Sequence, residues 1–246
     1  MEDILFRSSS TGHLMGEPIL KADKEAGNLS ETAKTNLIDI FVRNQYGRQT
    51  DITNKYVEKG LMVEEDAITL YSRVKKTFFR KNEDHLKNAF IMGTPDCFLG
   101  ENINQASHIV DVKSSWDIFT FFRTKYKKMN PLYYWQLQSY MALTGAKTAA
   151  LAYCLVDTPE CFLKDEKRRL LYSMGATEDN ELYQEACKAL EKQMIYQDIP
   201  MKERVIEFEI KRNDEDIKRL YAKIAKAREY LKFIQSEIPN ELQLTA

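Results

Sequence analysis

One stretch, residues 93–140, constrains this chain more than any other, because it sets out two acids, a lysine and a helical pair in a fixed order. Its letters include GTPDCFLG, then HIVDVKSS, then YYWQLQSYMALTG. Side chains on a strand alternate between its two faces, so Asp111 and Lys113 point to one side and Val112 to the other. One face of this strand can therefore carry polar chemistry while the other lies in the core.

Asp96 lies in the same stretch, at a bend in an apolar run that is followed by turn residues. These turn residues allow the run to fold back on the strand near 107–113 as a hairpin. In a hairpin, Asp96 and Asp111 can converge on one hard cation, since Mg²⁺ takes carboxylate oxygens and keeps several waters. Lys113 would then orient an attacking water or help to deprotonate it. The stretch predicts a Mg²⁺ site with hydrolytic chemistry.

An acid followed two residues later by lysine occurs four times, so this spacing alone does not identify the site. The other three pairs are Asp165/Lys167, Asp216/Lys218 and Glu209/Lys211. The first two fall in charge-rich segments that are typical of a solvated surface. The third lies on a predicted strand, where polar and apolar residues alternate as they do on a half-exposed strand. Only Asp111 is preceded by apolar residues on its strand and by a Pro-Asp bend upstream, and is followed by a helix with Gln and Tyr four residues apart.

These segments resemble the PD-(D/E)XK nuclease superfamily and, within it, the phage-type, lambda-exonuclease-like (YqaJ-like) recombination exonucleases. The segment FRSSSTGHLM is similar to the family's N-terminal Arg/Ser segment, and KGLMVEEDAITLY is similar to its Gly-x-x-x-Glu helix. The family's central motifs match GTPD, DVKSSWDIFTF and YYWQLQSYMALTG of this chain. The resemblance covers most of the chain and implies a restriction-endonuclease-like α/β core.

The resemblance assigns roles to the matching positions of this sequence. The implied catalytic residues are Glu64, Asp96, Asp111, Lys113, Gln136 and Tyr140. The implied ligands of Mg²⁺, or of Mn²⁺ as a second option, are Asp96, Asp111, Val112 and Glu64. Glu64 is preferred to Glu65 because of the Asp66-Ala67 and Tyr71 that follow it. Arg7 and Ser9 would lie where such exonucleases hold the end of the DNA.

The implied function is a metal-dependent deoxyribonuclease that hydrolyses phosphodiester bonds of double-stranded DNA, as a 5′ to 3′ exonuclease in phage recombination and DNA repair. Two alternatives stay open: an endonuclease of the same superfamily, and a catalytically silent DNA-binding or scaffold protein with the same fold. The intact set of Glu64, Asp96, Asp111 and Lys113 argues against the silent protein. The family also implies a single-strand annealing protein as partner and a ring-shaped homo-oligomer.

The composition fits one nuclease domain over residues 1–246, with a catalytic core at about 60–157 and a C-terminal strand and helices at 180–238. A hydrophobic content of 43% suffices for a core.

A net charge of −1 provides no global attraction to DNA, so binding would depend on local basic patches. The best candidate patch is Arg123, Lys125, Lys127 and Lys128. Two others are Lys75, Lys76, Arg80 and Lys81, and Lys164, Lys167, Arg168 and Arg169. Each is also compatible with an ordinary solvated helix end.

Several other residues have a structural and a functional interpretation. The aromatic residues Trp116, Phe119, Phe121 and Phe122 could stack on unpaired bases, although aromatics at this spacing after a strand usually pack. His108 is expected to be structural, because imidazole is not a preferred ligand of Mg²⁺. The four cysteines are dispersed and form no CxxC pair, which disfavours zinc and iron–sulfur sites.

No apolar run reaches membrane-spanning length, and residues 1–20 lack the apolar core of a secretory signal. We therefore expect a protein with reduced thiols in a cytoplasm, that of a bacterial host if the phage resemblance holds.

The periodicity predicts an α/β fold with a central mixed β-sheet flanked by helices and a long C-terminal helix. Helices are expected near 30–46, 61–75, 116–124, 131–144, 180–196 and 213–236. Ser30 can cap the first of these, and Gly47 is its expected stop. Strands are expected near 77–81, 89–99, 107–113, 148–156 and 204–211. The apolar stripe of the last helix is expected to pack on the core rather than on a partner.

Overall fold

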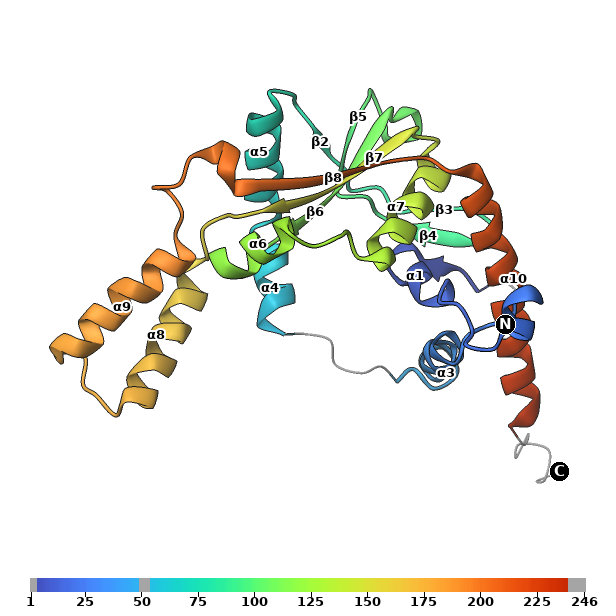
Figure 1. The fold of residues 1–246 in the computed structure, drawn as a ribbon, viewed down its shortest axis with the longest axis horizontal. Coiled ribbons are helices and arrows are strands. Elements are labelled where there is room, and N and C mark those ends of the chain that lie inside the picture. The colour runs from blue at the N-terminus through green and yellow to red at the C-terminus, as the bar shows by residue number, and fades with distance from the viewer. Residues whose placement is uncertain (1–3, 49–53, 239–246) are drawn as a thin grey trace.

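A computed structural model describes residues 4–48 and 54–238, and its centre is a five-stranded sheet in the order β2-β5-β6-β7-β8 (Figure 1). The strands are β2 (Arg80–Lys81), β5 (Cys97–Leu99), β6 (His108–Ser114), β7 (Thr148–Cys154) and β8 (Val205–Lys211). Strands β6 and β7 run parallel, and the other neighbours in this sheet run antiparallel. The predicted mixed sheet is confirmed, and so is the hairpin that joins β5 to β6.

A second, smaller sheet has the order β1-β4-β3. Its strands are β1 (Phe6–Arg7), β3 (Leu86–Lys87) and β4 (Ile91–Gly93). Strand β1 runs parallel to β4, with Arg7 opposite Met92, and β3 runs antiparallel to β4. This sheet brings the N-terminal Arg/Ser segment beside the Gly-Thr-Pro-Asp motif.

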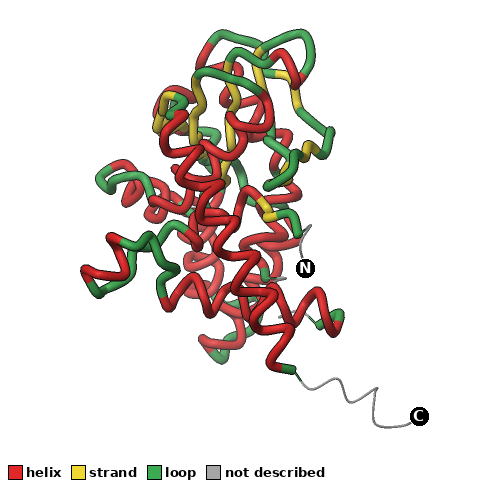
Figure 2. The backbone as a smooth tube through the Cα atoms, turned by 90° about the vertical axis from the view of Figure 1, so that its right-hand side faces the viewer, coloured by secondary structure: helices red, strands yellow, loops and turns green. Residues whose placement is uncertain are grey.

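Helices surround the two sheets, and Figure 2 shows the strands gathered toward one end of the molecule with helices along the rest. The helices are α1 (Thr11–Leu14), α2 (Lys21–Glu25), α3 (Glu31–Tyr46), α4 (Lys55–Met62), α5 (Glu64–Lys75), α6 (Ile118–Lys125), α7 (Pro131–Thr144), α8 (Glu160–Met174), α9 (Glu181–Met194) and α10 (Asp214–Glu237). Short 3₁₀ turns are η1 (Ser8–Ser10), η2 (Ile103–Gln105) and η3 (Met201–Arg204).

The central sheet is covered on both faces, and the alternation along β6 decides which residues meet which helix. Val110 and Val112 pack in a cluster with Ala67 and Tyr71 of α5. Ile109, on the opposite face, packs in another cluster with residues of α7 such as Leu137 and Met141. Asp111 shares the face of Ile109 because side chains two residues apart point the same way. The predicted division of this strand into an apolar face and a polar position is confirmed.

Two predicted elements are interrupted in the structure. The helix expected over 61–75 breaks at Val63, where α4 ends and α5 begins. Val63 is buried, and three acids follow it in the first turn of α5, where the helix dipole favours negative charge. The strand expected over 89–99 divides into β4 and β5, which belong to different sheets. Pro95 lies at the division, and proline cannot donate to a strand ladder.

The C-terminal helix α10 packs along α3 through the stripe that the sequence predicts. Leu220, Ile224 and Leu231 are fully buried in a cluster with Leu37 and Phe41 of α3. Helix α3 begins at the predicted cap, where Ser30 Oγ accepts a hydrogen bond from the N–H of Ala33 at 3.2 Å. The apolar stripe of α10 is therefore a core face, as expected.

Helices α8 and α9 form a hairpin that projects from one end of the sheet (Figure 1). The sequence analysis predicts α9 but not α8. Within the parts of the chain that the structure describes, no helix combines the length and the apolar content that crossing a membrane requires.

Candidate active site

Asp111 lies on β6 at the centre of the candidate site, and its residue is only 1% exposed. Its Oδ1 accepts a hydrogen bond of 2.8 Å from Nε2 of Gln136 on α7. Its Oδ2 lies 2.7 Å from Nζ of Lys113. This second contact is an ion pair rather than a directed hydrogen bond, since Oδ2 accepts no hydrogen bond in the described structure. One buried carboxylate therefore joins the strand, its lysine and the facing helix.

Asp96 reaches the same region from the bend before β5. The register places Cys97 opposite Val110, which brings Asp96 alongside Asp111. Oδ2 of Asp96 accepts a hydrogen bond of 2.7 Å from the main-chain N–H of Val112. The β5–β6 hairpin therefore brings together the two acids that the sequence analysis expects to converge.

A buried asparagine holds the bend that carries Asp96. The N–H of Asn82 donates to the carbonyl of Asp96 at 2.9 Å, and its Nδ2 donates to the carbonyl of Pro95 at 3.0 Å. Asn82 is 6% exposed, so these bonds also satisfy polar groups that water does not reach freely. The sequence analysis does not identify Asn82, because nothing in a lone Asn after a short strand marks it as a support for a distant carboxylate.

Lys113 is the cation of the site, and about a third of its side chain is exposed. Burial lowers the pKa of this lysine, but the carboxylates of Asp111 and Asp96 outweigh burial and raise the pKa above its usual range. Its ammonium also lies 5.7 Å from the centre of the Tyr133 ring. Lys113 is therefore held as a protonated donor rather than as a free base.

Gln136 and Tyr140 lie one turn apart on α7 and contact each other in the site. Nε2 of Gln136 donates to the hydroxyl of Tyr140 at 3.1 Å, as well as to Asp111. Burial is the main cause that raises the pKa of the Tyr140 hydroxyl well above its usual range, and the nearby Asp111 raises it further. Tyr140 therefore stays a neutral, protonated neighbour of the acids.

The N-terminal segment contacts the site through Ser8. Its Oγ donates to the carbonyl of Met92 at 3.1 Å, and Ser8 is 1% exposed. A methyl group added to Gly93 would lie 2.8 Å from both Ser8 Oγ and a ring carbon of Tyr140. Only glycine allows the three residues to approach this closely. The neighbouring Arg7 and Ser9, which the sequence motif indicates, are exposed, and Ser8 is not marked by any pattern in the sequence.

Glu64 begins α5 near the acids, and its side chain is 31% exposed. It lies 3.7 Å from Nζ of Lys81, which forms a closer ion pair of 2.8 Å with Glu65. Glu64 contributes to raising the pKa of Asp96, whereas the Glu65 side chain is 79% exposed and points to solvent. Of the two glutamates, Glu64 is the one that lies toward the site.

The acids of the site carry more negative charge than Lys113 balances. Burial and the neighbouring Asp111 raise the pKa of Asp96 to about 7, against the lowering effects of Lys113 and the Val112 N–H. A carboxylate with a raised pKa beside a second acid is typical of functional sites. The site is therefore arranged to receive additional positive charge.

The oxygen donors of the site suit a hard divalent cation. Within residues 4–48 and 54–238, no three His, Cys, Asp or Glu side chains form a closed ligand cluster. Mg²⁺ needs no such cluster, since it is often held by one or two carboxylates while waters and substrate phosphate complete its shell. Asp96 and Asp111 offer these oxygens, and Oδ2 of Asp111 accepts no hydrogen bond. Val112 could serve only through its main-chain carbonyl. The residues fit Mg²⁺ or Mn²⁺.

The other acid–lysine pairs lie outside this arrangement. Glu209 and Lys211 are on β8, where Glu209 is opposite Ala150. Asp165 pairs with Arg168 at 3.0 Å on the surface of α8. His108 is occupied structurally, because its Nδ1 lies 2.8 Å from Oγ1 of Thr148.

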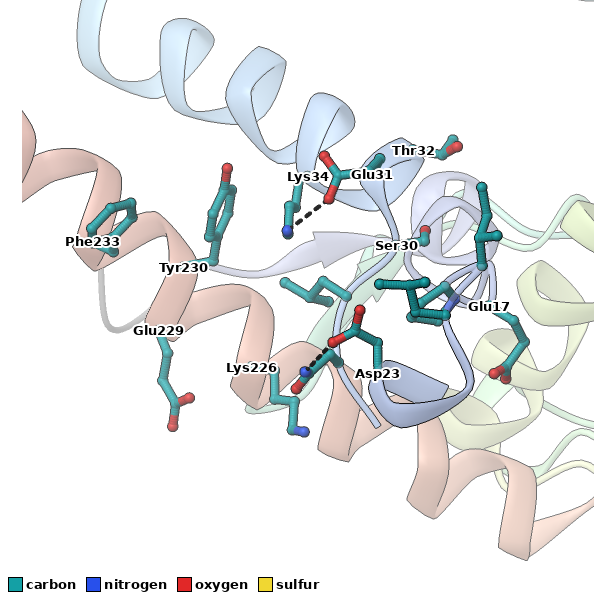
Figure 3. Close-up of a pocket in the computed structure, with 15 residues that line it drawn as sticks. Glu17, Asp23, Ser30, Glu31, Thr32, Lys34, Lys226, Glu229, Tyr230 and Phe233 are labelled. Carbon is teal, nitrogen blue, oxygen red and sulfur yellow. Dashed lines mark hydrogen bonds and ion pairs between the residues drawn. The ribbon is translucent and has the colours of Figure 1, made fainter. Parts of the chain in front are cut away.

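Two hollows lie away from the acids of the candidate site. Arg7 lines a hollow of about 550 Å³ with Ser10, Arg43 and Asn44, beside the smaller sheet. A hollow of about 830 Å³ lies between residues 17–34 and α10 (Figure 3). No residue of β5, β6 or α7 lines this second hollow, so it does not belong to the candidate site.

Comparison with known proteins gives matches among solved structures. No family model matches the sequence, and no curated protein is significantly similar to it. The crystal structure of a phage-related exonuclease from Haemophilus somnus 129PT is 28% identical, covers 96% of this chain and 97% of its own, and superposes with a TM-score of 0.76. An alkaline exonuclease from Laribacter hongkongensis is 14% identical over 95% of this chain and 92% of its own, with a TM-score of 0.59. A complex of the Laribacter exonuclease with dAMP is 15% identical, over the same shares, with a TM-score of 0.58.

The fold and the acid–lysine pair on β6 together are those of a nuclease of the exonuclease type. Over nearly its full length the chain is similar in fold to phage-related and alkaline exonucleases, the lambda-exonuclease-like (YqaJ-like) class that its motifs resemble. The resemblance that the sequence motifs indicate is confirmed.

Proposed function

We propose that this protein is a Mg²⁺-dependent deoxyribonuclease that degrades double-stranded DNA from its ends as a 5′ to 3′ exonuclease. The observation that carries the proposal is the buried Asp111, which meets Lys113 at 2.7 Å and Gln136 at 2.8 Å beside Asp96. The similarity to solved exonucleases supports action at DNA ends. Mn²⁺ is an alternative metal.

In this proposal Asp96 and Asp111 would hold the metal, and Glu64 and the Val112 carbonyl would be further ligands. The bound metal would neutralise charge on the scissile phosphate and make water a nucleophile near neutral pH. Lys113 orients the attacking water by donating hydrogen bonds from its ammonium, and the same charge stabilises negative charge that develops on the phosphate. Gln136 fixes the carboxylate of Asp111, and Tyr140 fixes Gln136 in turn.

We place the DNA end near Arg7 and Ser9, as the family resemblance implies. Arg7 lies on β1 opposite Met92 of β4, four residues before Asp96. Arg43 lines the same hollow, and a guanidinium binds phosphate through charge-assisted hydrogen bonds.

The biological setting belongs to the proposal as well. We propose a role in phage recombination or DNA repair in a cytoplasm, with a single-strand annealing protein as a partner and a ring-shaped homo-oligomer as the working form. These features follow from the family resemblance, and each can be tested separately from the chemistry.

The proposal is tested with linear duplex DNA labelled in turn at each 5′ and 3′ end, beside a covalently closed circle, with Mg²⁺ or EDTA. We expect metal-dependent release of the 5′ label, an intact circle and no release by Asp111→Ala. Nicked circles would move the assignment to an endonuclease. Binding without cleavage would support the silent DNA-binding protein and would overturn the proposal.

A further inference from the structure

A surface on and after α6 combines exposed aromatic rings with unpaired cations. We define the α6 surface by Phe119, Arg123, Lys125, Tyr126, Lys127 and Lys128. The chain connects it to elements of the active site at both ends, β6 before it and α7 after it. Helix α6 begins five residues after Lys113, and the segment that follows α6 ends at Asn130, which caps α7. Tyr133, in the first turn of α7, has its ring 5.7 Å from Nζ of Lys113. Figure 1 shows α6 below β6 and this segment running on to α7.

The four cations of the α6 surface differ from those of the other basic patches. In the described parts of the chain, none of Arg123, Lys125, Lys127 and Lys128 forms an ion pair with an acid. The patch on α8 is neutralised residue by residue, through Lys164–Glu160, Lys167–Glu191, Arg168–Asp165 and Arg169–Glu166. In the patch near 75–81, Lys75 and Lys81 are also paired with glutamates. Lys76 and Arg80 of that patch have no ion pair in the described structure, so of the three patches the α6 surface is the one in which all four cations lack an acid partner.

The aromatic residues of this region divide into packed and exposed ones. Phe121 is fully buried with Leu155 and Tyr196, and it anchors α6 to the sheet. Phe119 is 55% exposed and Tyr126 is 83% exposed. These two line an open hollow of about 470 Å³ with Ile118, Phe122 and Arg123. The anchored helix therefore exposes the rings of Phe119 and Tyr126, which its packing on the sheet does not need.

Rings and cations together indicate the chemistry of the ligand. A phosphate backbone would supply the negative charge that the four cations lack. Exposed aromatic rings stack on bases, but only where the bases are unpaired, and such stacking tolerates any sequence. A twofold contact with a second copy of this chain fits less well, because it would bring the same four positive charges together.

We propose that the α6 surface binds single-stranded DNA beside the active site. In the reaction proposed above, this strand is the one left unpaired as its complement is degraded. Only that identification of the strand rests on the proposed function. The binding itself rests on the exposed rings and unpaired cations.

The test measures binding without cleavage. The full-length protein carrying Asp111→Ala is titrated, in EDTA, against a fluorescein-labelled oligo-dT strand, an abasic strand of the same length and a blunt duplex, with anisotropy as the readout. The aromatic variant is Phe119→Ala/Tyr126→Ala, and its control is Tyr172→Ala, which removes a ring that is 77% exposed on α8. The charge variant is Lys125→Gln/Lys127→Gln, and its control is Lys164→Gln/Arg168→Gln.

We expect the aromatic variant to lose about tenfold or more in affinity for oligo-dT, since each stacked base contributes about 1–3 kcal/mol. Its affinity for the abasic strand and the duplex should change little. The charge variant should lower the dependence of affinity on salt, by a slope of about 1.4 for two phosphate contacts. Both controls should bind as the parent protein does.

Unchanged oligo-dT affinity in the aromatic and charge variants would overturn the proposal. So would a change of oligomeric state in the aromatic variant with oligo-dT binding intact, because the surface would then face a protein. If the aromatic variant does not fold, as judged by thermal unfolding, the charge variant decides alone. Failure of the proposed function would be seen separately, as absence of cleavage by the unmutated protein in Mg²⁺.

Discussion

Gln136 donates a hydrogen bond of 2.8 Å to Oδ1 of Asp111, and this contact fixes helix α7 to strand β6 at a fully enclosed point of the site. Because Gln136 also donates to Tyr140, one amide sets the position of the carboxylate and of the phenol. The four-residue spacing of Gln136 and Tyr140 therefore places both side chains where they can orient Asp111 of strand β6.

Replacing Gln136 by leucine should therefore impair both stability and cleavage. The substitution leaves Oδ1 of Asp111 buried without a donor, which costs about 1–3 kcal/mol of unfolding free energy. A misdirected carboxylate should also lower the cleavage rate by about tenfold or more. Urea unfolding and single-turnover cleavage measure the two effects. The surface variant Gln184→Leu on α9 should match the parent, and equal behaviour of both variants would contradict this role of Gln136.

Gly93 is predicted to be a position where even alanine is damaging. The added methyl group would lie 2.8 Å from Ser8 Oγ and from a ring carbon of Tyr140, so one of them must move. We expect a loss of about 1–3 kcal/mol in stability from overpacking and a slower enzyme. Gly60→Ala is the matched control, since nothing lies within 4 Å of its added methyl group. An active, stable Gly93→Ala protein would show that this approach is not required.

Lys59 provides a prediction for the dependence of stability on pH. It is 1% exposed and donates to the carbonyls of Ser115 and Trp116 and to Oγ1 of Thr158, while burial lowers its pKa to about 8. Between pH 8 and its unfolded pKa of about 10.4, the unfolded chain binds more protons than the folded protein at this site. The free energy of unfolding therefore gains a contribution as the pH rises, of up to about 3 kcal/mol.

This gain is measured as the difference in unfolding free energy between the parent protein and Lys59→Met from pH 7.5 to 10.5. The difference should grow in favour of the parent protein as the pH rises, although the variant is less stable throughout. A difference that is constant or that shrinks would show that burial does not lower the pKa of Lys59.

Mg²⁺ should stabilise the folded protein through Asp96 and Asp111. A ligand that binds only the folded state raises the unfolding free energy by about 1.4 kcal/mol when its concentration is about ten times its dissociation constant. Thermal unfolding with and without Mg²⁺ should show an increase for the parent protein and none for Asp96→Asn or Asp111→Asn. Asp165→Asn, on the surface of α8, should respond as the parent protein does. An equal response of all four proteins would contradict a metal site at these acids.

The sequence correctly predicts the strands and helices whose bounds depend on local pattern. Strand β6 lies within one residue of its expected bounds, because alternating faces of the sheet determine which of its residues are apolar. Helix α3 begins after Ser30 and ends at Gly47, which has a φ of 63°, as their capping chemistry predicts. The convergence of Asp96, Asp111 and Lys113 follows from the same regularities, whereas the role of Gln136 is implied by the family resemblance.

Other features depend on contacts that the sequence does not show. Helix α8 was missed because its charge run indicates solvated surface, and in fact only Phe162 and Leu163 of this helix are buried. Asn82 and Ser8 support the site through long-range contacts, such as the bond from Ser8 to Met92, which is 84 positions away. No periodicity marks a residue whose partner is so distant.

The central claim is that the acid and lysine of β6, rather than the similar pair of β8, perform phosphodiester hydrolysis. Single-turnover cleavage of linear duplex DNA in Mg²⁺ compares Lys113→Met and Asp111→Ala with Lys211→Met and Glu209→Ala. The account predicts that the first two variants fold but lose cleavage by about a hundredfold or more, while the second two retain it. Full activity in Lys113→Met or Asp111→Ala would contradict the account directly.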